Sequence, residues 1–415
     1  MSFLEKLLNS TQVEWKTLGE VGEFIRGNGM QKKDFVEVGF PAIHYGQIYT
    51  KYGLSANKTF TYVSENLAAK LRKAQKNDLL LATTSENDED VVKPLAWFGE
   101  AVAISGDMVI FRHGQNVKYL TYFIQTKIFQ EQKRKYITGT KVRRVSINDL
   151  SKILVPIPSP ENPKRSLEIQ GEIVRILDTF SAMTAELTAE LSMRKKQYNY
   201  YRDQLLSFKD DENVECKTLG WVGDVRMCKR ILKHQTSDIG EIPFFKIGSF
   251  GKKPDAFISR NIFEQYKNKY HYPKIGEVLI SASGTIGRAV VFDGKDAYFQ
   301  DSNIVWIEND ETKVLNKYLF YFYKVANWSI SDGGVIKRLY NENIKKTPIL
   351  IPYASEPEKS LAEQARIINI LDKFDALTSS ITDGLPREIE LRQQQYEYYR
   401  DLLLSFPQRD LEEIV

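Results

Sequence analysis

The stretch QYNYYRDQLLSF, residues 197–208, returns near the end of the sequence as QYEYYRDLLLSF, residues 395–406. Only the positions of Asn199 and Gln204 differ between the two copies. Chance does not produce a match of this length, so the chain contains an internal repeat. The repeat is taken first, because it decides how every other pattern in the sequence is interpreted.

Shorter matches extend the repeat toward the N-terminus. VEWKTLG at Val13–Gly19 returns as VECKTLG at Val214–Gly220, an offset of 214 − 13 = 201. KYLTYF at Lys118–Phe123 returns as KYLFYF at Lys317–Phe322. The chain therefore carries one plan twice, and each copy should fold into the same kind of unit.

Each copy begins with a region that is rich in strand-like runs. They lie at Asp78–Ala82 and Met108–Phe111 in the first copy, and at Glu277–Ser281 and Ile304–Ile307 in the second. Gly and Asn interrupt these runs, a pattern typical of a mixed α+β domain. Each region closes with a strand that ends in proline, at residues 153–158 and 349–352, and a proline-bearing linker follows.

A long amphipathic helix is predicted after the first linker. Its apolar seam advances by alternating steps of four and three residues, the heptad rule of a coiled coil. The seam consists of Ile173, Leu177, Phe180, Thr184, Leu187, Leu191, Arg194, Tyr198, Tyr201, Leu205 and Phe208. A helix from Ser166 to Phe208 would be about 65 Å long, with Ser166 as its N-cap.

The second helix repeats this seam and then departs from it. The first part of the seam consists of Ile367, Leu371, Phe374, Thr378, Ile381 and Leu385. Four extra residues then interrupt the repeat, and the seam continues with Tyr396, Tyr399, Leu403 and Phe406. The extra residues lie around Gly384 and Pro386, which should kink the helix there. Ser360 with Glu363 predicts a capping box at the start of the helix.

These patterns predict an α+β protein with a pseudo-twofold internal repeat: two mixed α/β domains separated by two long antiparallel coiled-coil helices. The predicted parts are an N-terminal helical segment at residues 1–10, a first domain at 11–158, a central helix at 159–209, a second domain at 210–353, and a C-terminal helix and tail at 354–415. The alternative is a coiled coil that forms only between two copies of the chain.

Composition restricts the class of protein. The 415 residues are 42% hydrophobic and 27% charged, so the chain can build full cores. We expect a cytoplasmic protein, because no apolar run could span a membrane, the N-terminus lacks a signal-peptide pattern, and two cysteines make no disulfide framework. The net charge is only +4, yet basic residues cluster at 133–144, 229–233 and 267–274. Local clusters of this kind suit a face that binds phosphates.

Motifs for catalysis are missing from the sequence. None of the 14 prolines adjoins another, as the motif of an amino-methyltransferase would require. The two Gly-Lys pairs, at Gly251 and Gly294, continue with Lys253 and Asp296 rather than with the Ser or Thr of a phosphate-binding loop. The four histidines show no metal-ligand spacing. We therefore expect a protein that is not an enzyme and holds neither metal nor cofactor.

The repeated motifs resemble those of a known family. ILDTF at 176–180, TAELTAEL at 184–191, GEVLISASGTIG at 276–287 and the tyrosine-rich repeat are similar to the specificity subunits of type I restriction–modification systems. The first domain departs from the SASGTIG pattern and has ATTSEN at 82–87.

The resemblance implies two target recognition domains that each read half of a split double-stranded DNA site. It implies two methyltransferase subunits docked on the helices and recognition domains, and motor subunits for restriction attached through them. S-adenosylmethionine, ATP and Mg²⁺ would belong to those partner subunits.

Reading DNA requires cations for phosphates and polar side chains for base edges. The candidate DNA-binding residues are Arg26, Gln31, Lys32, Lys33, Thr84, Ser85, Asn87, Thr140, Lys141, Arg143 and Arg144 in the first domain, and Lys229, Arg230, Lys233, Gln235, Ser283, Thr285, Arg288, Lys337, Arg338 and Tyr340 in the second. Arg143 and Arg144 align with Lys337 and Arg338 at an offset of 337 − 143 = 194. A basic pair at the same place in both copies favours a functional role.

The repeated tyrosine motif offers a second kind of surface. Tyr198 and Tyr201 lie on the seam and are expected in the core, whereas Tyr200 lies off it. Candidate residues for binding a methyltransferase are Tyr200, Arg202, Tyr398 and Arg400. Two other functions stay open at this point: a coiled-coil adaptor that does not bind DNA, and the specificity subunit of a restriction enzyme of another type.

Overall fold

The computed structural model describes residues 11–208, 213–329, 337–380 and 382–406. They form two compact units, one made of the residues up to Thr188 with those from Ile389 onward, and the other of Ala189–Glu388. The predicted N-terminal helical segment at residues 1–10 lies outside the described residues. No helix in the described ranges is long and apolar enough to cross a membrane.

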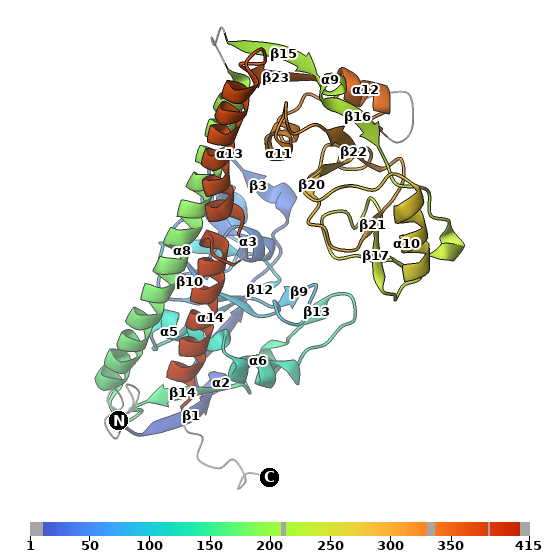
Figure 1. Cartoon of the computed structure of the whole chain (residues 1–415). Helices are drawn as coiled ribbons and strands as arrows, with labels where there is room; N and C mark the ends of the chain where they lie inside the picture. Colours follow the sequence, from blue (N-terminus) through green and yellow to red (C-terminus); the bar gives the residue numbers. More distant parts are fainter. Residues whose placement is uncertain (1–10, 209–212, 330–336, 381, 407–415) are drawn as a thin grey trace. The chain divides into compact units, whose positions relative to one another are not determined.

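Two five-stranded sheets form the mixed α/β domain of the first unit (Figure 1). The first sheet has the order β2 (Gly22–Arg26), β12 (Met108–His113), β8 (Leu79–Ala82), β10 (Lys93–Trp97) and β5 (Ser55–Ala56). The second has the order β3 (Phe35–Val36), β6 (Thr61–Val63), β4 (Phe40–Ile43), β11 (Val102–Ile104) and β7 (Lys73–Ala74). The strands predicted at Asp78–Ala82 and Met108–Phe111 are the central β8 and β12, and their apolar residues are fully buried.

The mixed α/β domain of the second unit is built in the same way, with fewer strands in its two sheets among the residues that the structure describes. Its first sheet has the order β16 (Gly223–Arg226), β22 (Ile304–Asn309), β19 (Val278–Ser281) and β20 (Ala289–Val291). Its second sheet has the order β18 (Phe257–Ile258), β17 (Ile242–Phe245) and β21 (Tyr298–Phe299). The predicted strands at Glu277–Ser281 and Ile304–Ile307 are again at the centre, as β19 and β22.

A two-stranded antiparallel ribbon closes each domain before its helix. In the first unit β1 (Val13–Thr17) pairs with β14 (Leu154–Pro158), and in the second β15 (Val214–Thr218) pairs with β23 (Pro348–Pro352). The repeated VExKTLG motif and the proline-ended strand are thus paired in both copies, which explains why these two stretches match across the repeat.

The first long helix, α8 (Pro163–Ser207), has 45 residues and is about 68 Å long. The second long helix is divided into two elements, α13 (Pro357–Ser379) and α14 (Leu385–Leu404). The break lies at the predicted place, but it ends the helix rather than kinking it. Gly384 fits there because a Cβ would lie 2.5 Å from the carbonyl oxygen of Ala376.

Both predicted helix caps were wrong. Ser166 lies one turn inside α8 and Ser360 one turn inside α13, and both are buried. The N-cap of α13 is Glu356, with Pro357 as the first helical residue. The serine hydroxyls instead accept from a glutamine four residues later, Gln170 Nε2 at 3.0 Å and Gln364 Nε2 at 3.1 Å.

The heptad seams pack on each other in antiparallel order. Within the first unit Phe180 of α8 stacks on Tyr399 of α14, with ring centroids 5.2 Å apart. Within the second unit Tyr201 of α8 stacks on Phe374 of α13 at 5.6 Å. The contacts advance along α8 while they go back along the second helix, so the seams are satisfied within one chain. Tyr201 was predicted to be in the core, but it remains 40% exposed beside its partner ring.

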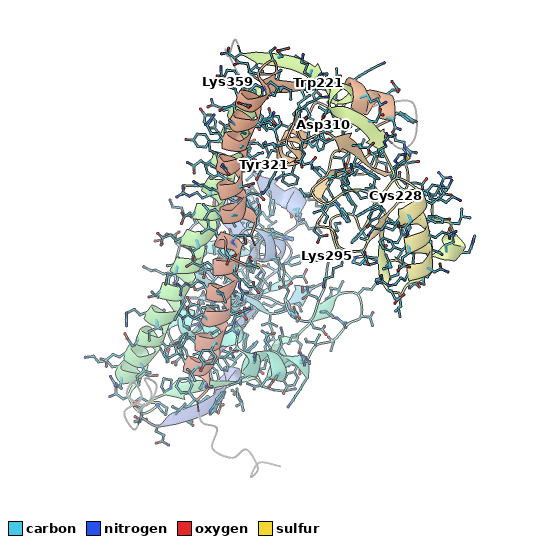
Figure 2. All side chains as sticks on the ribbon, viewed as in Figure 1. Trp221, Cys228, Lys295, Asp310, Tyr321 and Lys359 are labelled. Carbon is cyan, nitrogen blue, oxygen red and sulfur yellow. The ribbon has the colours of Figure 1, made fainter. Side chains whose placement is uncertain are left out.

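Each mixed α/β domain is joined to its helix by the same set of polar contacts. In the first unit Lys118 of α5 (Val117–Ile124) donates to Asp178 of α8 at 2.7 Å, and Tyr122 donates to the same carboxylate. In the second unit Lys317 of α11 (Asn316–Tyr323) donates to Asp372 of α13 at 2.8 Å. Tyr321 donates to that carboxylate, and Figure 2 shows it beside α13.

The buried glutamines complete this joint. Gln170 Oε1 accepts from the backbone N–H of Asn116 at 2.9 Å, and Gln364 Oε1 accepts from that of Leu315 at 2.9 Å. Both glutamines are fully buried, so each holds the start of a domain helix at a fixed place on the spacer helix. The joint positions the rest of each domain.

Candidate nucleic-acid interface

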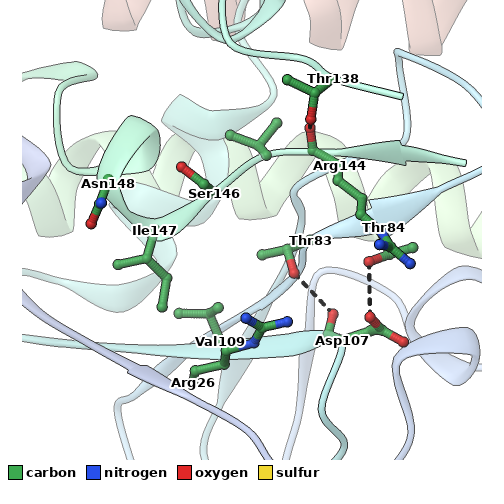
Figure 3. A pocket seen from close by; sticks show the side chains of 11 residues that line it. Arg26, Thr83, Thr84, Asp107, Val109, Thr138, Arg144, Ser146, Ile147 and Asn148 are labelled. Atoms are coloured by element: carbon green, nitrogen blue, oxygen red, sulfur yellow. Dashed lines mark hydrogen bonds between the residues drawn. The ribbon is translucent and has the colours of Figure 1, made fainter. Parts of the chain in front are cut away.

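A polar turn follows the central strand β8 in the first mixed α/β domain (Figure 3). Thr83 donates its backbone N–H to the carbonyl of Asp107 at 3.0 Å, and Thr84 Oγ1 donates to Asp107 Oδ1 at 3.1 Å. Thr84 and Ser85 form β9, which pairs with Arg144 and Arg143 of β13. The turn therefore brings three hydroxyl side chains, one carboxylate and two arginines together.

This turn borders a cleft of about 470 Å³. The cleft is lined by Arg26, Thr83, Thr84, Asp107, Val109, Thr138, Arg144, Val145, Ser146, Ile147 and Asn148. Arg26, Thr84 and Arg144 were predicted as DNA-binding residues, and the fold brings them to one place. Asp107, Ser146 and Asn148 were missed, because an acid carries the wrong sign for phosphate and the other two lie outside the basic runs.

The second mixed α/β domain repeats the turn after β19. Ala282 donates its backbone N–H to the carbonyl of Asn303 at 2.7 Å, and Ser283 Oγ donates to Asn303 Oδ1 at 2.8 Å. Ser283 forms an antiparallel bridge with Arg338, as Thr84 does with Arg144. Leu339 then donates to the carbonyl of Ala282 at 2.8 Å. Thr84, Asp107 and Arg144 in the first domain thus correspond to Ser283, Asn303 and Arg338 in the second. We call these three equivalent positions the polar frame.

The loops after the polar frame differ between the domains. In the first domain the loop is acidic, and Asn87 Nδ2 donates to Asp90 at 2.9 Å while Arg143 pairs with Asp88 at 2.8 Å. Arg143 also donates to the carbonyl of Gly139. Arg143 is thus engaged in ordering its own loops, whereas Arg144 is exposed at the cleft.

Lys133 does not belong to the basic surface that the sequence suggested. Its side chain is buried, at 1% exposure, and its ammonium group donates to the carbonyls of Glu89 and Val91 at 3.0 and 2.9 Å. Burial lowers the pKa of Lys133 to about 8, although the carboxylates of the acidic loop oppose the shift. Lys133 holds the acidic loop against the domain and is not available to phosphates.

The corresponding loop of the second domain is a glycine turn. Gly284 and Gly287 have φ values of +65° and +79°, a region that side chains disfavour. A Cβ on Gly287 would also lie 2.4 Å from Nε1 of Trp328. Arg288 donates to the carbonyl of Phe250 at 2.9 Å and to the hydroxyl of Thr285 at 3.4 Å. Thr285 is exposed in the turn.

The early loops of both domains, which carry candidate DNA-binding residues, contain a short 3-10 turn. In the first domain it spans Lys32–Asp34, with Gln31 before it, and Gln31, Lys32 and Lys33 are exposed. In the second domain it spans Lys233–Gln235, and the Gln235 side chain accepts from the backbone N–H of Leu232 at 2.8 Å.

The remaining predicted DNA-binding residues lie around these turns. Arg230 donates to Asp301 at 2.8 Å, and Arg26 Nε lies 3.5 Å from the carbonyl of Gly106. The exposed residues include Arg26, Thr140, Lys141, Lys229, Arg230, Lys337 and Tyr340. The fold thus brings Arg26, Thr84 and Arg144 to the cleft of the first domain.

The predicted partner-binding residues form a matched pair of surfaces on the helices. Tyr200 and Tyr398 are 58% and 64% exposed. Arg202 pairs with Asp203 at 2.7 Å and lies over the ring of Tyr198, with its guanidinium carbon 5.6 Å from the ring centroid. Arg400 repeats both contacts, with Asp401 at 2.8 Å and Tyr396 at 5.7 Å, and only 9% of its surface is exposed. The tyrosines are thus the open groups.

The residues that the structure describes contain no group of three or more His, Cys, Asp or Glu side chains that could hold a metal ion. What the fold offers twice is a mixed α/β domain anchored to a long helix, with a hydroxyl, an arginine and an acid or amide at one turn. These features define a class of proteins with two repeated recognition modules on one pair of spacer helices.

The family is shown by comparison with known proteins. The type I restriction modification DNA specificity domain matches residues 12–193 and again residues 211–391. The chain belongs to the family of specificity subunits of type I restriction–modification systems.

Two relatives match this chain in sequence over almost its whole length. A putative type I restriction enzyme specificity subunit of Haemophilus influenzae is 44% identical, with 98% of each chain covered. The specificity subunit of a type I restriction enzyme of Escherichia coli is 36% identical, again with 98% of each chain covered.

Solved structures share the fold. A chain from a type I restriction–modification complex has a TM-score of 0.58 at 15% identity, covering 94% of this chain and 97% of that one. The S subunit from M. genitalium has a TM-score of 0.51 at 13% identity, covering 97% and 98%.

Proposed function

We propose that each recognition domain of this specificity subunit reads one half of a split double-stranded DNA target. The observation that carries the proposal is the polar frame, which recurs at the same strand register in both domains beside loops that differ. A recurring arginine can neutralise a phosphate and fix the register on DNA, while the variable loops meet base edges. Two such domains on one chain would read two half-sites.

The paired helices would set the gap between the half-sites and dock methyltransferase subunits. The exposed Tyr200 and Tyr398 support this docking, because both lie at the same place in the repeat and their rings carry apolar area with a polar tip. Motor subunits would join through the methyltransferases.

Catalysis would belong to the partners. S-adenosylmethionine, ATP and Mg²⁺ are assigned to them on this proposal, and this chain supplies recognition alone. The sequence motifs point the same way, because the proline and Gly-Lys patterns of such chemistry are missing from it.

The test is a gel-shift measurement with the chain co-expressed with the methyltransferase encoded beside it. We expect the purified complex to bind host DNA fragments that carry its target more tightly than fragments without it. Equal affinity for all fragments would reject sequence reading, and no binding at all would favour a coiled-coil adaptor.

A further inference from the structure

Asp107 and Asn303 occupy one structural position in the two recognition domains. Met108 pairs with Ala82 and Ile304 pairs with Ser281, so the residue before each strand follows the same register. At the far ends of these strands His113 pairs with Gly22, and Asn309 pairs with Gly223.

The pairing between the polar turn and the arginine of the frame gives the same alignment of the two domains. Thr84 lies opposite Arg144, and Ser283 lies opposite Arg338. Three separate pairings therefore place the carboxylate of Asp107 and the amide of Asn303 at equivalent points of the polar frame.

Of the three positions in the frame, this one changes its hydrogen-bonding chemistry. Arginine is kept, and threonine is replaced by serine, which keeps the hydroxyl. Each hydroxyl donates to the Oδ1 atom of its partner, at 3.1 Å for Asp107 and 2.8 Å for Asn303. The head groups are thus held alike, but a carboxylate only accepts hydrogen bonds, whereas an amide donates as well.

The surroundings of Asp107 favour a hydrogen-bond donor on the DNA as its partner. It lines the cleft together with Arg26 and Arg144, so DNA phosphates that bind these cations would come near a negative charge. Phosphates repel a carboxylate, and a hydrogen bond that the carboxylate accepts from a base offsets part of that repulsion. Cytosine N4 offers such a donor in the major groove, while adenine N6 and N7 match the two functions of an amide.

We propose that Asp107 and Asn303 are equivalent specificity-determining positions, each contacting one base edge in its own half-site. Asp107 accepts from an exocyclic amino group, that of cytosine, and Asn303 bonds to adenine through both atoms of its amide. The inference rests on the proposed reading of DNA by the two domains and adds the residue and the base class to it.

The test exchanges the two residues. Complexes with the co-expressed methyltransferase carry Asp107→Asn or Asn303→Asp, and each selects binders from a randomised duplex library. We expect Asp107→Asn to change the preference at one base pair of the first half-site from cytosine toward adenine. Affinity for the original site should fall about tenfold to hundredfold, as one good base contact implies. Asn303→Asp should do the reverse in the second half-site alone.

The matched control is Glu186→Gln, which likewise turns a carboxylate into an amide. Glu186 is exposed on α8, outside both recognition domains, so the selected sequences should stay those of the wild type. Thermal denaturation of each complex checks that the folds are equal.

The outcomes separate the two levels. A variant that keeps the wild-type preference, or that weakens binding to all duplexes equally, overturns the specificity role and leaves the proposed function standing. A wild-type complex that selects no sequence at all would overturn the proposed function and this inference with it.

Discussion

The two recognition domains are alike where they meet the helices and different where the polar frame opens to solvent. Lys118, Tyr122 and Asp178 in the first unit correspond to Lys317, Tyr321 and Asp372 in the second, with the same donors and acceptor. Beyond the frame, an acidic loop held by Lys133 stands where the other domain has a glycine turn. The repeat therefore keeps what fixes a domain to its helix and varies what can face a ligand.

The largest effect is expected on stability, at the two polar joints between each domain and its helix. Gln170→Leu removes a fully buried amide and leaves the backbone N–H of Asn116 without its acceptor, at a cost of about 1–3 kcal/mol in the free energy of unfolding. Gln364→Leu should cost the same in the second unit, because it makes the equivalent bond to Leu315. Thermal denaturation measures the loss, and hydrogen exchange should locate it at the start of α5 or α11.

The control is Gln204→Leu. This exposed residue aligns with Leu402, so the repeat itself contains the change. Stability equal to the wild type is expected there. Joint variants no less stable than this control would show that the two polar joints are not the shared anchors.

The arginines of the frame should show a smaller effect, on DNA binding alone. Arg143→Ala with Arg144→Ala should weaken binding to all duplexes and flatten the dependence of log K on log salt by about one to two. Arg144 should account for most of it, since Arg143 is paired with Asp88. The same double change at Lys337 and Arg338 should give a similar flattening, and Lys195→Ala on the exposed surface of α8 should give none. An unchanged slope would assign these residues to structure.

Strand and helix positions could be predicted because apolar periodicity is local. The central strands and the seam of α8 follow directly from residues such as Leu79–Ala82 and Leu177. The caps could not, since Ser166 and Ser360 bind glutamines in a joint that only the tertiary fold creates. Lys133 was read as surface for a similar reason, because nothing near it in the sequence shows the carbonyls of Glu89 and Val91.

Asp107 was missed although a signal for it exists. It lies 23 residues from Thr84 in the sequence, and an acid does not stand out in a search for DNA contacts. Alignment of the two copies puts it opposite Asn303, and a change between acid and amide at a repeated position is what would have found it. The basic pair at 143–144 and the hydroxyl at 84 were predicted because they carry the expected chemistry, and of these the fold places Thr84 and Arg144 at the cleft.

The smallest expected change is in the gap between the two half-sites, when α8 is lengthened. One more Thr-Ala-Glu-Leu after Leu191 lengthens α8 by about 6 Å and rotates its end by about 40°. One base pair rises about 3.4 Å and turns about 35°, so a domain can follow the groove over one to two base pairs. We expect both half-sites to be kept and their gap to grow by about one base pair, as mapping of methylated sites would show. The wild-type gap in this variant would mean that α8 does not set the spacing.

The central claim is that the two domains read two half-sites independently. Its direct test replaces residues 11–158 with the first domain of another family member and maps methylated adenines across the host genome. The account predicts that one half of the target changes to that of the donor, while the other half and the gap stay as in the wild type. A change in both halves, or in neither, would contradict it.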